Sequence, residues 1–179
     1  MAQTPSREPE GAGGAADSTG AAFTTRVSAA LVVNTRSRRG RRLYARALEL
    51  LQRGGVRLDH RHPLRDPRRL RESVRAAIAQ GAQLVILGGG DGSVSAVVNE
   101  LAHRDVVLGV LPLGTANSFA RTLGIPLAIE GAVETILRGR VANIDLGRIG
   151  DHYFANTTAL GLSSAIAHSR LAALKRWLG

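Results

Sequence analysis

The residues best suited to chemistry surround Asp91, in the segment Gly88–Ser93 that follows the apolar run Gln83–Leu87. Glycines lack a β-carbon, so they allow positive φ and let the main chain approach a ligand closely. The pattern after the loop predicts a helix over Ser93–His103, whose N–H groups and positive dipole end would point at the same spot. The segment therefore predicts an anion-binding loop. Its candidate contacts are Gly89, Gly90, Asp91, Gly92 and Ser93.

Asp91 is out of place in such a loop, because its carboxylate would repel a bare phosphate. The repulsion disappears if the carboxylate accepts hydrogen bonds from loop amides or faces a metal ion. We therefore treat Asp91 as the candidate catalytic residue and the candidate Mg²⁺ ligand, acting through water or on an attacking hydroxyl. The alternative is a tight turn at Gly90–Gly92 with Asp at a favoured position. The loop matches neither a Walker motif nor a GxGxxG fingerprint.

A second polar loop follows the apolar run Val106–Leu111. Gly114, Thr115 and Asn117 offer backbone, hydroxyl and amide groups that could contact phosphate, ribose or base. The alternative for Asn117 is to cap a helix predicted over Asn117–Leu123. Two glycine-containing loops after successive parallel strands predict a shared crevice at the carboxyl edge of the sheet.

A third candidate segment, Asn34–Gly40, follows the first apolar run. Asn34, Ser37 and Gly40 could complete a phosphate cradle. The arginines there, Arg36, Arg38, Arg39, Arg41 and Arg42, are assigned mostly to a solvated face, with one or two meeting phosphates or anionic lipid headgroups.

The elements that would position these loops alternate between apolar strands and amphipathic helices. Strands are predicted at Val27–Val33, Val56–His60, Gln83–Leu87 and Val106–Leu111, and helices at Arg41–Arg53, from the Asp66-Pro67 cap to Gln80, and at Ser93–His103. Further helices are predicted at Asn117–Leu123 and Ala128–Arg138. This alternation predicts a three-layer α/β domain, a parallel sheet with helices on both faces and right-handed connections.

The pattern changes near Val141, where a hairpin is predicted from Val141–Ile149 and His152–Ala159 around a Gly150-Asp151 turn. An amphipathic helix is expected over Ser163–Leu178. The expected organisation is a disordered tail over 1–25, a nucleotide-binding domain over 26–140 and the beginning of an incomplete β-rich domain over 141–179. Apolar surface left open there would need a partner, and a homodimer is one open candidate.

Composition narrows the class of partner. The formal charge is +10, and all but one of the 24 basic residues are arginine, so nucleic acid, anionic membranes and phosphorylated ligands are the partners to weigh. Only Tyr44 lies near the basic cluster, so no specific nucleic-acid recognition by stacking is expected. The chain has no cysteine, which excludes disulfides and thiolate metal sites. No apolar run approaches the roughly 20 residues of a membrane span, and a cytoplasmic location is expected.

Taken in order, VVNTRSRRG, VILGGGDGSVSAVVNEL, GVLPLGTANSFARTLGIP, NIDLGRI and YFANTTALGLSSAIA resemble the diacylglycerol kinase catalytic domain of bacterial lipid kinases and of sphingosine and ceramide kinases. The likeness covers about Ser28 to Gly179. GGDG followed by PLGTxN at this separation is specific, whereas GGDG alone also recurs in NAD kinases and phosphofructokinase-like folds.

The resemblance implies an N-terminal α/β domain, a β-rich second domain, and ATP with Mg²⁺ in the cleft between them. It also implies transfer of the γ-phosphate to a lipid hydroxyl at the membrane surface. Carried over by position, the nucleotide contacts would be Asn34, Gly90, Asp91, Gly92, Ser93, Gly114, Thr115 and Asn117. The chain departs from many bacterial members at Ser95-Ala96, where they carry Asn-Glu, and at Ser118, where they carry Asp.

Three functions follow as hypotheses. The first is an ATP-dependent, peripherally membrane-associated lipid kinase, with weak activity expected of this chain because the resemblance places much of the lipid site beyond it. The second is a non-catalytic nucleotide- or lipid-surface-binding module, favoured by Ala96 and Ser118. The third is an NAD-kinase-like enzyme, which the PLGTANSFARTLG segment disfavours.

Overall fold

A computed structural model describes residues 23–36 and 38–155 of the chain. Its centre is a parallel four-stranded sheet with the strand order β2-β1-β3-β4. The strands are β1 (Ala29–Asn34), β2 (Leu58–Leu64), β3 (Leu84–Gly89) and β4 (Val107–Pro112). The inner strands β1 and β3 are almost wholly buried, as expected for strands covered on both faces.

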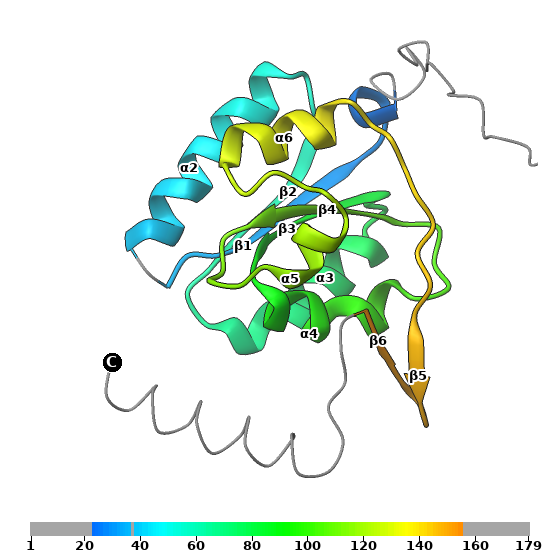
Figure 1. Ribbon diagram of the computed structural model, residues 1–179. Helices are drawn as coiled ribbons and strands as arrows, with labels where there is room; N and C mark the ends of the chain where they lie inside the picture. The colour runs from blue at the N-terminus through cyan, green and yellow to red at the C-terminus, as the bar shows by residue number, and fades with distance from the viewer. Residues whose placement is uncertain (1–22, 37, 156–179) are drawn as a thin grey trace, which may run out of the picture.

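Helices cover both faces of the sheet (Figure 1), which confirms the predicted α/β fold. The helices are α2 (Arg38–Arg53), α3 (Leu70–Ala79), α4 (Asp91–Leu101), α5 (Ser118–Thr122) and α6 (Ile129–Leu137). One core lies under α2 and α6 and includes Leu31, Leu51 and Val133. The other lies under α3, α4 and α5 and includes Val32 and Val97.

The strands and helices predicted between residues 26 and 140 are present, and their bounds differ for physical reasons. Helix α2 begins at Arg38 rather than Arg41, so Gly40 lies in its first turn and not in a loop. Asp66 accepts a hydrogen bond from the backbone nitrogen of Arg68 at 3.0 Å. It thereby caps a short 3-10 turn, Pro67–Arg69, which leads into α3.

Strand β2 runs further than the sequence predicted, to Leu64, and contains Pro63. Proline lacks a backbone N–H and is tolerated on an edge strand, which is the position of β2. The pairing with β1 shifts register between Ala29 and Ala30, so that Ala29 lies opposite Leu58 but Ala30 lies opposite His60. This bulge turns His60 and His62 to the α3 face of the sheet, since they pair with residues of that core.

The N-terminal boundary needs correcting. Residues 23–26 form a helical turn, although the sequence placed the disordered tail up to residue 25. Phe23 packs against the core, Thr24 is buried, and the backbone nitrogen of Val27 donates to the carbonyl oxygen of Phe23. The packed domain therefore begins at least as early as Phe23.

The predicted hairpin is shorter in the structure. Strands β5 (Gly147–Ile149) and β6 (His152–Phe154) pair antiparallel around the Gly150-Asp151 turn. The structure assigns no strand to residues 141–146, and the predicted strand residues beyond 155 and the helix Ser163–Leu178 lie outside the described residues. Val141, Ile144 and Ile149 are exposed.

Candidate functional site

The three predicted loops meet at one edge of the sheet. Strands β1, β3 and β4 are parallel neighbours, and their carboxyl ends are in register: Val33 lies opposite Gly88, and Gly88 lies opposite Leu111. The chain order reverses between β1 and β3, because β2 lies on one side of β1 and β3 on the other. Ligands of open α/β sheets bind at such switch points.

The two glycine-containing loops touch through their backbones. A β-carbon added to Gly114 would lie 2.5 Å from the Cα of Gly90, and one added to Gly90 would lie 3.0 Å from the Cα of Gly114. Both positions therefore require glycine for close packing. The contact is extended by Leu113, whose backbone nitrogen donates to the carbonyl oxygen of Gly89 at 2.8 Å.

Asp91 links the same two loops through its side chain. Its carboxylate accepts hydrogen bonds from the backbone nitrogens of Ser118 at 3.0 Å and Phe119 at 2.9 Å. These are the first residues of α5, whose amides have no partner within the helix. Of the two ways in which an aspartate could be tolerated in the loop, the structure shows acceptance of backbone amides, here from the neighbouring loop.

Asn117 closes its own loop and does not cap α5, which corrects the alternative considered for it. Its Oδ1 accepts from the backbone nitrogen of Gly114, and its Nδ2 donates to the carbonyl oxygen of Gly114, both at 2.9 Å. Asn117 is buried and has a left-handed backbone with φ 51°. Thr115 lies at the exposed tip of this loop.

Gly92 differs from the other glycines of the site. A β-carbon there would meet nothing within 4 Å, so the folded chain does not need glycine for packing. Gly92 lies in the first turn of α4 and is exposed. By contrast, a β-carbon on Gly89 would collide with the Ser93 hydroxyl. The open space at Gly92, at a helix N-terminus, fits an approaching anion.

The candidate residues of the segment after β1 lie in different settings. The Oδ1 of Asn34 accepts a hydrogen bond from the backbone nitrogen of Arg36 at 3.1 Å. This bond holds the Asn34 side chain in a local turn at the carboxyl edge of the sheet. Thr35 is buried and bonds to the Leu64 carbonyl oxygen. Gly40 is buried in α2, and Ser37 lies outside the described residues.

No group of three His, Asp or Glu side chains could hold a metal ion in the part of the chain that the structure describes. Mg²⁺ usually binds through one or two carboxylates together with waters and substrate phosphates, so a nucleotide-dependent site needs no preformed cluster. Asp91 supplies the carboxylate within these loops. The loops therefore fit Mg²⁺ only when phosphate oxygens of a nucleotide provide further ligands. Nor does any described helix combine the length and apolar character required to cross a membrane.

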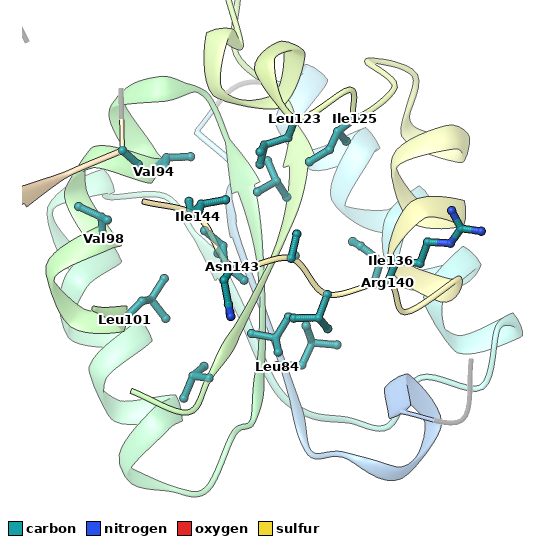
Figure 2. Close-up of a pocket in the computed structure, with 18 of the residues that line it drawn as sticks. Leu84, Val94, Val98, Leu101, Leu123, Ile125, Ile136, Arg140, Asn143 and Ile144 are labelled. Carbon is teal, nitrogen blue, oxygen red and sulfur yellow. The ribbon is translucent and has the colours of Figure 1, made fainter. Parts of the chain in front are cut away.

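A cavity of about 500 Å³ lies elsewhere, along the open edge of β4. Figure 2 shows Val94, Val98 and Leu101 of α4 on one side of it, and Ile136 on the other. Asn143 and Ile144 belong to the segment that crosses it. Neither Gly88–Ser93 nor Gly114–Asn117 lines this cavity. The polar groups of the candidate site converge at the loops, apart from this mainly apolar cavity.

Two contacts were missed in the sequence. Glu100 of α4 is buried and accepts hydrogen bonds from Arg71 at 2.8 Å and Arg75 at 3.0 Å on α3. The hydrogen bond from Arg75, and after it the one from Arg71, lower the Glu100 pKa to about 2 against the opposing effect of burial. The four-residue spacing of these arginines was a usable signal. The second contact, between Asn99 and Tyr153, had no signal in the sequence.

Known proteins resemble this chain in sequence and in structure. A chain 40% identical over 111 residues is a probable lipid kinase YegS-like protein of Yersinia pestis (strain Pestoides F), and one from Yersinia pseudotuberculosis serotype O:1b (strain IP 31758) matches equally. The match covers 59% of this chain and 38% of each relative.

Among solved structures, a diacylglycerol kinase from Bacillus anthracis str. Sterne superposes with a TM-score of 0.63 at 27% identity. That likeness covers 71% of this chain and 49% of the other. The chain therefore spans well under two thirds of the length of these relatives. The model of the diacylglycerol kinase catalytic domain matches residues 28–149, which is more than half of the chain. On this evidence the chain belongs to the diacylglycerol kinase catalytic domain family.

Proposed function

We propose that this chain carries the nucleotide-binding part of a lipid kinase, which transfers the γ-phosphate of ATP to a lipid hydroxyl. The observation that supports it best is the junction of Gly90 with Gly114, because it brings two loops into one site beside the open space at Gly92. The relatives are named as lipid kinases or diacylglycerol kinases. The acceptor class comes from that likeness, and the phosphate site from the geometry.

Each loop has a proposed role at the nucleotide. The first turn of α4, with Gly92 and Ser93, binds phosphate oxygens through backbone N–H groups and a hydroxyl. Thr115 contacts ribose or base from its exposed tip. Asp91 would hold Mg²⁺ through water or act on the attacking hydroxyl, while its amide contacts keep its carboxylate in one orientation. Mg²⁺ would supply charge neutralisation across the phosphates. Asn34 would complete the cradle from β1.

A lipid acceptor lies in a membrane, so the chain must act at a membrane surface. We propose that the chain attaches peripherally to the cytoplasmic side of the membrane. The net charge of +10 favours anionic leaflets. Because the chain spans 38% of its Yersinia relatives, we expect it to bind nucleotide and to phosphorylate lipid only weakly by itself.

The test is a titration of the 179-residue chain with ATP and Mg²⁺ by calorimetry, beside an assay of lipid-dependent ATP turnover on vesicles containing diacylglycerol. We expect saturable Mg²⁺-dependent ATP binding. The absence of any ATP binding would refute the proposed site.

A second candidate is a nucleotide-binding module without catalysis. It is favoured by the amide contacts of Asp91, which give that side chain a structural task. ATP binding without turnover on any lipid would favour the module, provided that it is seen both in the chain and in a fusion that adds the part of a Yersinia relative outside the match. Phosphorylation of NAD in place of lipid would favour the NAD-kinase alternative.

A further inference from the structure

The side-chain amide of Asn99 on α4 hydrogen-bonds to the backbone of β6 in the way that the backbone of a neighbouring strand would. The backbone nitrogen of Tyr153 donates to Asn99 Oδ1 at 2.8 Å, and Asn99 Nδ2 donates to the Tyr153 carbonyl oxygen at 3.4 Å. A carboxamide presents the same donor and acceptor as a peptide group. Asn99 is partly buried on the last turn of α4, so its amide is held where the hairpin meets the helix.

The hairpin is built to present these two groups. Ile149 pairs with His152 next to the two-residue turn, and Arg148 pairs with Tyr153. Antiparallel pairs alternate between hydrogen-bonded and non-hydrogen-bonded. In the second pair, both backbone groups of Tyr153 therefore point away from β5 and towards α4.

The ring of Tyr153 is fixed at two further points. Its hydroxyl lies 2.8 Å from His103 Nε2, and the two rings meet edge to face with centroids 5.1 Å apart. The guanidinium of Arg148 lies 5.7 Å from the ring centroid, within cation–π range. His103 has a left-handed backbone, with φ 58°, a conformation that is unfavourable for a non-glycine residue. That unfavourable conformation places its ring against Tyr153.

The hairpin depends on this contact for its order. Each of its strands has three residues, and an isolated two-stranded hairpin is marginally stable at best. Helix α4 begins at Asp91 and carries Asn99 eight residues later, about 12 Å along its axis. One helix therefore connects the loop proposed for phosphate binding with the hairpin (Figure 1).

We propose that Asn99 is a positioning residue, which fixes the β5–β6 hairpin on α4 and so sets where the chain leaves the nucleotide-binding domain. Asn99 acts through the Tyr153 backbone and does not touch the nucleotide loops. The proposal goes beyond the lipid kinase function and does not depend on it.

The test replaces Asn99 by Asp in the full 179-residue chain and follows the Tyr153 amide by NMR. The carboxylate keeps an acceptor for the Tyr153 N–H but places negative charge against the Tyr153 carbonyl oxygen. At pH 7 we expect exchange protection of Tyr153 to fall at least tenfold and its amide shift to move, while Ile86 in β3 stays protected.

Acidification provides a rescue that a general packing defect would not show. A protonated carboxyl again offers one donor and one acceptor, so protection of Tyr153, corrected for intrinsic exchange, should recover in Asn99→Asp as the pH falls. The charged and titratable groups facing the site are His103 from the end of α4, and Arg148 with its partner Asp151 on the hairpin. Repeating the series in a His103→Gln background removes the histidine titration.

Two controls complete the design. Gln52→Glu makes the same amide-to-acid change on an exposed site of α2 and should leave Tyr153 protected. Tyr153→Phe removes the hydroxyl but keeps the backbone pair, so protection at residue 153 should persist. Unchanged protection in Asn99→Asp overturns the proposal, and so does an equal loss at Ile86, because that result would assign Asn99 to the stability of the whole domain. Titration of Asn99→Asp with Mg²⁺ and ATP tests the nucleotide site separately.

Discussion

Asp91 Oδ1 lies 2.9 Å from the backbone nitrogen of Phe119, so an aspartate from the first turn of α4 caps helix α5. The carboxylate that the sequence assigned to chemistry therefore also joins the loops that follow β3 and β4. A cap of this kind contributes about 0.5–2 kcal/mol. Loss of the Asp91 carboxylate should disturb both the fold and the site, and experiments must separate the two effects.

The first prediction concerns Asp91→Asn. The amide keeps one acceptor but turns an NH₂ group towards a backbone N–H, so we expect the free energy of unfolding to fall by about 1 kcal/mol. We expect the free energy of Mg²⁺-dependent ATP binding to weaken by more than this loss of stability, and lipid-dependent ATP turnover to be lost. Thermal unfolding and calorimetric titration measure the two effects. Asp105→Asn, an exposed position, is the control. Reduced stability with unaltered Mg²⁺-ATP affinity would leave Asp91 a purely structural role.

The second prediction compares two glycines. Gly92→Ala should raise stability slightly, by up to about 1 kcal/mol, because alanine is the better helix former and its methyl group meets no atom. ATP affinity should nevertheless drop at least tenfold, because the methyl group enters the space proposed for phosphate. Gly114→Ala should instead destabilise the fold by about 1–3 kcal/mol. Chemical denaturation and ATP titration of both variants decide the matter. Wild-type affinity in Gly92→Ala would argue against phosphate binding there.

The third prediction concerns Glu100, which joins α4 to α3. Its pKa falls from an ordinary 4.5 to about 2 in the folded chain, so its ion pairs stabilise the fold above pH 4.5 and are lost as the pH falls towards 2. Glu100→Gln should cost about 1–3 kcal/mol at pH 7, and this difference from wild type should shrink below pH 4. Urea unfolding at several pH values checks it. Glu134→Gln, which loses an exposed pair with Arg138, should change little.

The fourth prediction concerns His62. Burial lowers its pKa, and the charges of His60 and Arg69 lower it further. The His62 imidazole therefore binds a proton more readily in the unfolded chain than in the folded one. Protonation below about pH 6.5 favours unfolding, so His62 lowers the free energy of unfolding as the pH drops through that value. His62→Leu should therefore flatten the dependence of unfolding free energy on pH between 8 and 5.5. The Glu100 pairs do not interfere, since they titrate lower. An equally steep dependence in His62→Leu would assign the effect to other groups.

The sheet and its helices could be predicted because buried strands and amphipathic helices have distinct periods. The inner strands β1 and β3 are short Val/Ile/Leu runs, and their order in the chain placed the loops on one edge. The start of α2 was missed because its first turn is arginine-rich, and positive charge is unfavourable at a helix N-terminus. The β2 segment was cut short because its polar DHRHP pattern is compatible with a strand only at a sheet edge.

Within the site, the sequence indicated Asp91, Gly90, Gly114 and Asn117, and all lie at the junction of the two loops. Their partners could not be read from spacing. The cap that Asp91 gives to Phe119 joins residues 28 positions apart. Likewise, the two bonds of Asn117 to Gly114 follow from a left-handed backbone that an asparagine permits but does not require.

The register shift beside Ala29 gives β2 one residue more than its partner at that point. Side chains alternate between the two faces of a strand, so a single extra residue inverts every later position. Regular pairing of the same sequence beyond Leu58 would therefore place the imidazoles of His60 and His62 under α2 and turn Arg61 into the layer beneath α3. Deletion of Asp59 would remove the bulge and leave both histidines on the α3 face. The pH dependence predicted from His62 thus depends on this single-residue bulge in the backbone as much as on the imidazole itself.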